Sequence, residues 1–266
     1  MCLGTIDFDH DGAVGTITMS DPPQNRLSVD MIDEFTTIVD AVDATEVRAV
    51  VIRGAGDNFS CVADLLGWYA TGTDPRQVGS YLVRLNQLFE QIETLPIPLI
   101  AAVRGVCSGG GLALSLHCDL TVAAPDCQIR FPEMTVAVPP LAGGVQRLTR
   151  CVGRAQAARM ALLADTITGA EAYEMGMIAR LVESDRVPSI ADELAHRLAD
   201  KPTTVLAAGK AVLRGWAQGG LGVADRLLGD LAAAGAPATD VTPTPSCADG
   251  PGVRQQPGAG TQLHRR

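Results

Sequence analysis

The chain has 266 residues, of which 47% are hydrophobic and 19% charged. A chain of this length and composition can bury a substantial core without disulfides or metal ions, which excludes a disordered protein. Its 21 basic residues against 30 acidic ones leave a net charge of -9, and this negative charge opposes binding to nucleic acids or anionic membranes. We therefore expect neither a nucleic acid nor a membrane among its partners.

The seven cysteines are an odd number and show no paired spacing. A chain of this size needs no disulfides for stability, so free thiols in a reducing compartment are the simpler interpretation. The N-terminal residues lack a basic segment followed by an apolar one, and no apolar run reaches the length of a membrane span. We expect a cytoplasmic protein.

Strand and helix patterns alternate over the first two thirds of the chain. Residues 14–19 alternate in the manner of a strand, and residues 31–42 repeat apolar side chains at helical spacing after Ser28, a candidate N-cap. The pattern continues with strands over 47–53, 99–103 and 120–124, a helix over 78–92 and a helix that opens at 109–111. Such alternation favours an α/β fold with a mostly parallel core sheet.

After about Val182 the pattern predicts helices only. They cover residues 190–198, 204–216 and 221–231, where alanine, leucine and arginine are enriched. The last segment is rich in proline and small residues and offers no apolar face, so we expect it to be disordered. We divide the chain into a core over 1–200, a helical region over 201–234 and a tail over 235–266.

A glycine run and two isolated carboxylates are candidates for chemistry. Gly109, Gly110 and Gly111 can present the free amides of a helix start to an anion, although tight strand-to-helix packing explains the glycines equally well. Glu133 lies in an apolar segment, yet a glutamate there is more often exposed or salt-bridged. Asp64 can simply cap a helix. These residues alone do not name a reaction.

A serine hydrolase and a metal site are weaker interpretations of nearby residues. Ser108 precedes His117 and Asp119 in the sequence, but Val106 stands where a nucleophile elbow needs glycine. His117 and Cys118 are adjacent and have no second pair at metal-ligand spacing. We expect a buried histidine and buried thiols instead.

Taken together and in chain order, these segments resemble the crotonase, or enoyl-CoA hydratase/isomerase, superfamily. The matching segments are colinear from about residue 5 to residue 230, namely 25–28, 58–65, 98–105, 109–113, 118–120, 131–133, 143–148, 168–172 and 176–179. The resemblance implies a crotonase-like spiral β/α core and a C-terminal helical oligomerisation region that forms homotrimers or dimers of trimers. It also implies an acyl-CoA substrate in fatty acid metabolism, so that coenzyme A is part of the substrate and no separate cofactor is expected.

The resemblance assigns roles to individual residues. The backbone amides of Ala63 and Gly110 would form an oxyanion hole for the thioester oxygen of an enolate, and Glu133 would be the catalytic carboxylate. Arg26 would contact a phosphate or the adenine of CoA, unless it is a solvated surface arginine. The other expected substrate and CoA-binding residues are Leu27, Cys61, Val62, Asp64, Leu65, Gly109 and Leu141, and no metal ligand is implied.

The pair of glutamates that hydratases of the family use is incomplete in this chain. Ala113 stands at the position of the first, and alanine can neither polarise water nor donate a proton. Isomerases of the family need one base, which takes a proton from C2 and returns it at C4. We therefore favour isomerase-like proton transfer by Glu133, whose pKa an apolar environment should raise, and keep hydration as the alternative.

Further departures from the family pattern favour a second alternative, a degenerate member that binds acyl-CoA without catalysis. Val62 and Leu141 stand where glycines are usual, and residues 235–266 lack the closing helix that touches CoA in the family. We expect weakened CoA binding. None of these motifs specifies the acyl chain.

Overall fold

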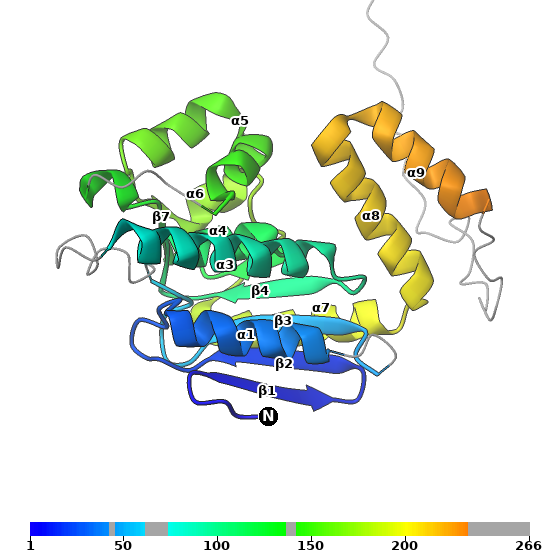
Figure 1. Cartoon of the computed structure of the whole chain (residues 1–266), viewed down its shortest axis with the longest axis horizontal. Helices are drawn as coiled ribbons and strands as arrows, with labels where there is room; N and C mark the ends of the chain where they lie inside the picture. The colour runs from blue at the N-terminus through cyan, green and yellow to red at the C-terminus, as the bar shows by residue number, and fades with distance from the viewer. Residues whose placement is uncertain (43–45, 62–73, 137–141, 234–266) are drawn as a thin grey trace, which may run out of the picture.

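The structure is a computed structural model, and it describes residues 1–42, 46–61, 74–136 and 142–233 (Figure 1). Within these ranges the strands are β1 (Ile6–Asp11), β2 (Val14–Met19), β3 (Ala49–Gly54), β4 (Leu99–Val103), β5 (Val106–Ser108), β6 (Leu120–Ala123), β7 (Gln128–Arg130), β8 (Ile167–Thr168) and β9 (Arg180–Leu181). The helices are α1 (Val29–Ala41), α3 (Pro75–Thr94), α4 (Gly110–His117), α5 (Gly144–Leu162), α6 (Gly169–Glu174), α7 (Val187–Ala199), α8 (Thr203–Gly219) and α9 (Leu221–Ala233), with 3-10 turns η1 (Glu133–Val136) and η2 (Ser184–Arg186).

The larger sheet has six described strands in the order β1-β2-β3-β4-β6-β9. Only β1 and β2 pair antiparallel, and every other neighbouring pair is parallel. The first four residues of β3 and all of β4 are buried and apolar, as expected for parallel strands covered on both faces. The predicted α/β class with a mostly parallel sheet is confirmed.

Helices cover both faces of this sheet. In Figure 1, α1 lies in front of the strands and α7 behind them, where α7 packs across β2, β3, β4 and β6. The buried residues of α7 are Val187, Ala191, Ala195 and Ala199, which recur every four residues and therefore share one helix face. Small alanine side chains let that helix approach the sheet closely.

The smaller sheet carries the elements that lead into the candidate site. Its described strands lie in the order β5-β7-β8, with β5 and β7 parallel. The chain leaves β5 directly into α4 and leaves β7 into η1. Because neighbouring parallel strands end at the same edge of a sheet, the start of α4 and the segment before η1 lie side by side. The N–H of Gly109 donates to the carbonyl of Arg130 at 3.0 Å across this edge.

Helices α8 and α9 form a hairpin beside the sheet and its covering helices (Figure 1). A Cβ at Gly215 would lie 2.4 Å from Leu227 Cδ1, so glycine permits close packing of the two helices there. Lys210 of α8 reaches the core, where its Nζ lies 2.8 Å from Asp119 Oδ2 and donates to the carbonyl of Ile97 at 3.0 Å. In the described part of the chain, no helix combines the length and apolarity that a membrane span requires.

Candidate functional site

The start of α4 presents an unpaired backbone amide. Gly109 is the N-cap with a φ of +56°, a conformation that residues with a side chain rarely adopt. Gly110 is the first helical residue, and its N–H has no hydrogen-bond partner among the residues that the structure describes. A free amide at the positive end of a helix stabilises negative charge on a ligand oxygen.

The segment that ends at Cys61 lies against this helix start. The carbonyl of Ser60 accepts the N–H of Ser108 at 2.9 Å, and the N–H of Ser60 donates to the carbonyl of Val106 at 3.2 Å. A Cβ on Gly111 would lie only 2.4 Å from the Ser60 oxygen, so glycine is required at that position. The structure thus brings Ser60 and the neighbouring Cys61, which is partly buried, beside Gly109 and Gly110.

Glu133 begins η1, and the structure places it in an apolar environment. The residue is 7% exposed, and its Oε2 has no hydrogen-bond partner within the described ranges. Burial raises the pKa of this carboxyl to about 7, as the sequence predicts. A carboxyl with such a pKa can both accept and return a proton near neutral pH.

Ala113 lies on α4 among apolar groups. It is 1% exposed, and a Cβ at Gly144 would lie 3.0 Å from its Cβ and 2.9 Å from the ring of Phe131. Phe131 is itself fully buried and lies two residues before Glu133. Position 113, where the resemblance places the first glutamate of a hydratase, is therefore enclosed by α4, Phe131 and the start of α5.

His117 serves neither as a hydrolase base nor as a metal ligand in this fold. Its Nδ1 lies 2.7 Å from the carbonyl of Ala113, and its ring packs on Phe89 with the centroids 4.8 Å apart. Burial and the nearby Arg147 lower the pKa of His117 to about 4. Within the described ranges, no three His, Cys, Asp or Glu side chains gather in a way that could hold a metal ion. The predicted buried histidine is confirmed.

Two residues of the predicted CoA-binding segment lie just before α1. Arg26 is exposed, and its guanidinium lies 3.6 Å from the Asp21 carboxylate. The side chain of Leu27 is fully buried in the core, and its carbonyl accepts the hydroxyl of Tyr81 at 2.7 Å. Only the backbone of Leu27 therefore remains for contact with a ligand. Five predicted residues, namely Val62, Ala63, Asp64, Leu65 and Leu141, lie outside the residues that the structure describes.

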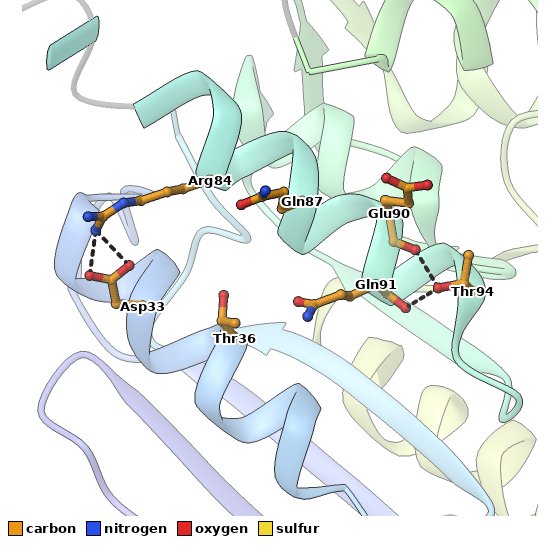
Figure 2. A pocket seen from close by; sticks show the side chains of 7 residues that line it. All are labelled: Asp33, Thr36, Arg84, Gln87, Glu90, Gln91 and Thr94. Carbon is orange, nitrogen blue, oxygen red and sulfur yellow. Dashed lines mark hydrogen bonds and ion pairs between the residues drawn. The ribbon is translucent and has the colours of Figure 1, made fainter. Parts of the chain in front are cut away.

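A separate hollow lies between α1 and α3 (Figure 2). Polar side chains line it, and Arg84 and Asp33 form an ion pair at 2.8 Å across its edge. It contains none of the predicted site residues. The candidate active site is therefore the region around the start of α4 and Glu133.

Comparisons with known proteins identify the family of the chain. A family model for enoyl-CoA hydratase/isomerase matches residues 9–219. A probable enoyl-CoA hydratase of Bacillus subtilis (strain 168) is 33% identical over 208 residues, which are 77% of this chain and 80% of that protein. The 2,3-dehydroadipyl-CoA hydratase of Escherichia coli (strain K12) is 33% identical over 195 residues, which are 71% of this chain and 72% of that protein.

Solved structures show the same architecture. The crystal structure of an enoyl-CoA hydratase from Bacillus anthracis matches with a TM-score of 0.81 and 29% identity, and the match covers 86% of this chain and 90% of that one. The described elements, the family model and the curated relatives agree over most of the chain. The chain has the crotonase fold and belongs to the enoyl-CoA hydratase/isomerase family.

Proposed function

We propose that the chain acts on enoyl-CoA thioesters by enolate chemistry, with Glu133 as the only catalytic carboxylate. The observation that carries the proposal is the buried Oε2 of Glu133, which lacks a partner among the described residues while alanine occupies position 113. Hydration in this family depends on two glutamates, whereas moving a double bond needs one base. Isomerisation is therefore the favoured reaction.

The steps need only a proton and a site for negative charge. The Glu133 carboxylate takes a proton from C2 of a 3-enoyl thioester, and the electron pair left on C2 delocalises onto the thioester oxygen. The N–H of Gly110, together with the predicted amide of Ala63, donates hydrogen bonds to that oxygen. Protonated Glu133 then delivers the proton to C4, and the double bond moves to C2–C3. Coenzyme A is carried by the substrate, and the steps use no other cofactor.

Hydration is the second candidate, because the relatives from Bacillus subtilis and Escherichia coli are named hydratases. In that reaction Glu133 would have to take a proton from water and deliver one to C2 without a second carboxylate. A single group can perform both tasks in turn, but it cannot hold the water from two sides. We therefore expect hydration to be slower than isomerisation.

The test follows deuterium uptake and product formation in heavy water, with 3-enoyl-CoA and 2-enoyl-CoA thioesters as substrates. The wild type is expected to exchange the C2 and C4 protons and to form the 2-enoyl product from the 3-enoyl one. Glu133→Gln should lower both rates by about 10²-fold or more while CoA binding persists. A 3-hydroxyacyl product formed faster than the isomer would favour the hydratase. Binding without any exchange would leave a non-catalytic acyl-CoA-binding protein.

We also propose that the α8–α9 hairpin joins copies of the chain into homotrimers or dimers of trimers. Val205, Leu213 and Trp216 of α8 are large apolar residues, and each is more than half exposed. Apolar residues gathered along one exposed helix favour a protein interface. Light scattering should give three or six times the chain mass, and Trp216→Asp should lower that mass. A wild-type monomer would contradict the proposal.

A further inference from the structure

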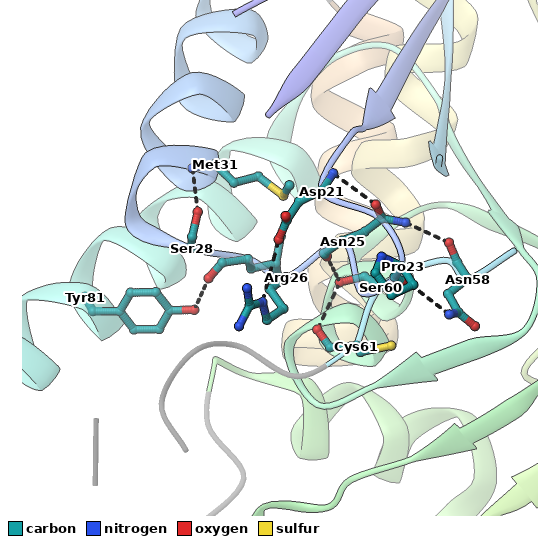
Figure 3. Close-up of polar contacts among 11 residues, drawn as sticks. Asp21, Pro23, Asn25, Arg26, Ser28, Met31, Asn58, Ser60, Cys61 and Tyr81 are labelled. Carbon is teal, nitrogen blue, oxygen red and sulfur yellow. Dashed lines mark hydrogen bonds and ion pairs between the residues drawn. The ribbon is translucent and has the colours of Figure 1, made fainter. Parts of the chain in front are cut away.

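Asn25 is the centre of a buried hydrogen-bond network just before α1 (Figure 3). It is fully buried and has a φ of +46°, a conformation that asparagine tolerates better than most residues. Its Nδ2 donates to the carbonyls of Ala55 and Asn58, each at 2.9 Å, and lies 3.3 Å from that of Phe59. The family resemblance placed Asn25 in a matching segment without a role, and the structure shows one.

The network extends from Asn25 into the segment after β3. The hydroxyl of Ser60, which is also fully buried, donates to the carbonyl of Asn25 at 2.7 Å. The N–H of Cys61 donates to the carbonyl of Gln24 at 2.7 Å. Asn58 adds a second link, since its Nδ2 donates to the carbonyl of Pro23 at 2.8 Å. The residues before α1 and those after β3 therefore hold one another over several residues.

The same network reaches the start of α4. Asn58 Oδ1 accepts the N–H of Val106, the first residue of β5, at 2.8 Å. The carbonyl of Ser60 accepts the N–H of Ser108 at the end of β5, and that oxygen packs directly against Gly111. Ser108 and Gly111 lie on either side of Gly109 and Gly110. Ser60 thus fixes the backbone immediately before and after the Gly110 amide.

We propose that Asn25 and Ser60 are positioning residues that hold the Gly110 amide in the orientation needed to stabilise an enolate. This inference rests on the proposed function of the site. Neither side chain contacts the reacting atoms, and each acts through the backbone of residues 58–61. An oxyanion donor is effective only when it points at the oxygen that gains charge, so a small displacement lowers the rate without abolishing binding.

The most direct test uses Ser60→Ala, which removes one hydroxyl and leaves the backbone bonds of Ser60 in place. Its matched control is Thr5→Val, which removes a partly buried hydroxyl bonded to Glu34 at 2.8 Å near β1. Ser60→Ala is expected to lower deuterium exchange about tenfold, which is less than the loss of a whole oxyanion-hole donor. The dissociation constant for CoA should stay within about twofold of the wild type because no CoA contact is removed, and Thr5→Val should leave both values unchanged.

A spectroscopic readout separates positioning from general destabilisation. 3-Oxobutyryl-CoA forms an enolate that absorbs in the near ultraviolet, so a titration gives the pH at which the bound ligand ionises. Binding to the wild type should lower the pKa of the ligand relative to free ligand. In Ser60→Ala the pKa of the bound ligand should be about one unit higher than in the wild type, which corresponds to the tenfold rate loss. Asn25→Asp removes the amide donors while keeping the side-chain shape, and it is expected to raise the pKa of the bound ligand further. Should Asn25→Asp fail to fold, Ser60→Ala carries the test.

The outcomes distinguish the positioning role from the proposed function. If the wild type neither exchanges deuterium nor promotes enolate formation, the proposed function fails and the inference fails with it. If the wild type does both and Ser60→Ala matches it, the positioning role is overturned while the proposed function stands. An equal loss in Ser60→Ala and Thr5→Val would show a merely structural effect and would also overturn the positioning role.

Discussion

Asp119 lies just before β6 and Glu133 follows β7, and the two carboxylates have opposite surroundings. Asp119 Oδ2 lies 2.8 Å from the ammonium of Lys210 and accepts the N–H of Leu99 at 2.8 Å. Glu133 Oε2 has no partner in the described part of the chain. Burial raises the pKa of both carboxyls, but at Asp119 the Lys210 ammonium opposes the rise.

The difference separates a structural charge from the one that we propose to be reactive. The ammonium and the amide around the partly buried Asp119 carboxylate favour its ionised form, and the ion pair joins α8 to the segment before β6. A buried carboxylate with an unpartnered oxygen destabilises the fold when it is ionised, and for that reason its proton moves easily near neutral pH. Asp119 thus contributes to stability, whereas Glu133 reduces it and remains available for proton transfer.

The largest expected effect comes from breaking the Asp119 pair. Lys210→Met leaves the partly buried Asp119 carboxylate without its counter-ion, and Asp119→Asn leaves the Lys210 ammonium without one. Each is expected to lower the free energy of unfolding by up to about 3 kcal/mol, because the Lys210 side chain is only 10% exposed and a poorly hydrated charge without its partner is costly. Combining the two substitutions should recover part of the loss. Urea denaturation of the four proteins measures this coupling.

An exposed ion pair gives the control for this experiment. Arg84 and Asp33 lie 2.8 Å apart, but each side chain is about half exposed (Figure 2). Solvent screens such a pair, so Arg84→Met should change the free energy of unfolding by less than about 1 kcal/mol. Equal losses in Arg84→Met and Lys210→Met would contradict the structural role of the partly buried pair of Lys210 and Asp119.

The sequence predicted the elements whose signals are local. The helix after Ser28 begins where predicted, and the Ser28 hydroxyl accepts the N–H of Met31 as an N-cap. Residues 14–19 form β2 as predicted, and the glycine run opens α4. Periodicity and capping chemistry depend on neighbours within a few positions, so they are visible without the fold.

The sequence did not predict the elements that depend on distant partners. The strand β1 alternates aspartates with other residues and is stable because it pairs with β2 at the sheet edge. The strands β5, β7, β8 and β9 have only two or three residues each, too few for a periodic pattern. Asp119 entered the analysis of the sequence as a weak hydrolase candidate and as part of the matching segment 118–120. Its ion pair was not predicted, because its partner Lys210 is distant in the chain. The hydrogen-bond network centred on Asn25 was not predicted for the same reason.

Removing the reactive charge should have the opposite effect on stability. Glu133→Gln eliminates a carboxyl whose pKa rises from 4.5 to about 7 on folding. A raised carboxyl pKa contributes stability that is fully present below pH 4.5 and is lost as pH rises through about 7. The variant should therefore gain up to about 3 kcal/mol relative to the wild type at pH 8, since each pKa unit corresponds to about 1.4 kcal/mol.

The pH dependence of this gain is the informative quantity, because the buried glutamine amide has its own cost at every pH. The difference in the free energy of unfolding between the variant and the wild type should grow from pH 4.5 to about pH 7 and level off above pH 7. Thermal or urea unfolding at several pH values measures it. A difference that does not change with pH would mean that Glu133 is paired in the folded protein.

The pH profile of the reaction shows whether the environment of Glu133 is the same with substrate bound. Proton abstraction requires the ionised form of Glu133, so deuterium exchange at saturating substrate should fall about tenfold per pH unit below the carboxyl pKa and level off above it. The midpoint should lie near the free-enzyme pKa of about 7 if the bound thioester leaves the surroundings of Glu133 unchanged. Exchange of the thioester in buffer alone is subtracted at each pH.

Ser60→Ala should lower the plateau without moving the midpoint, because Ser60 lies beside the oxyanion donor and not beside the base. A midpoint near 4.5, the ordinary value for glutamate, would show that the base is solvated during the reaction and that the contrast with Asp119 is lost once substrate binds.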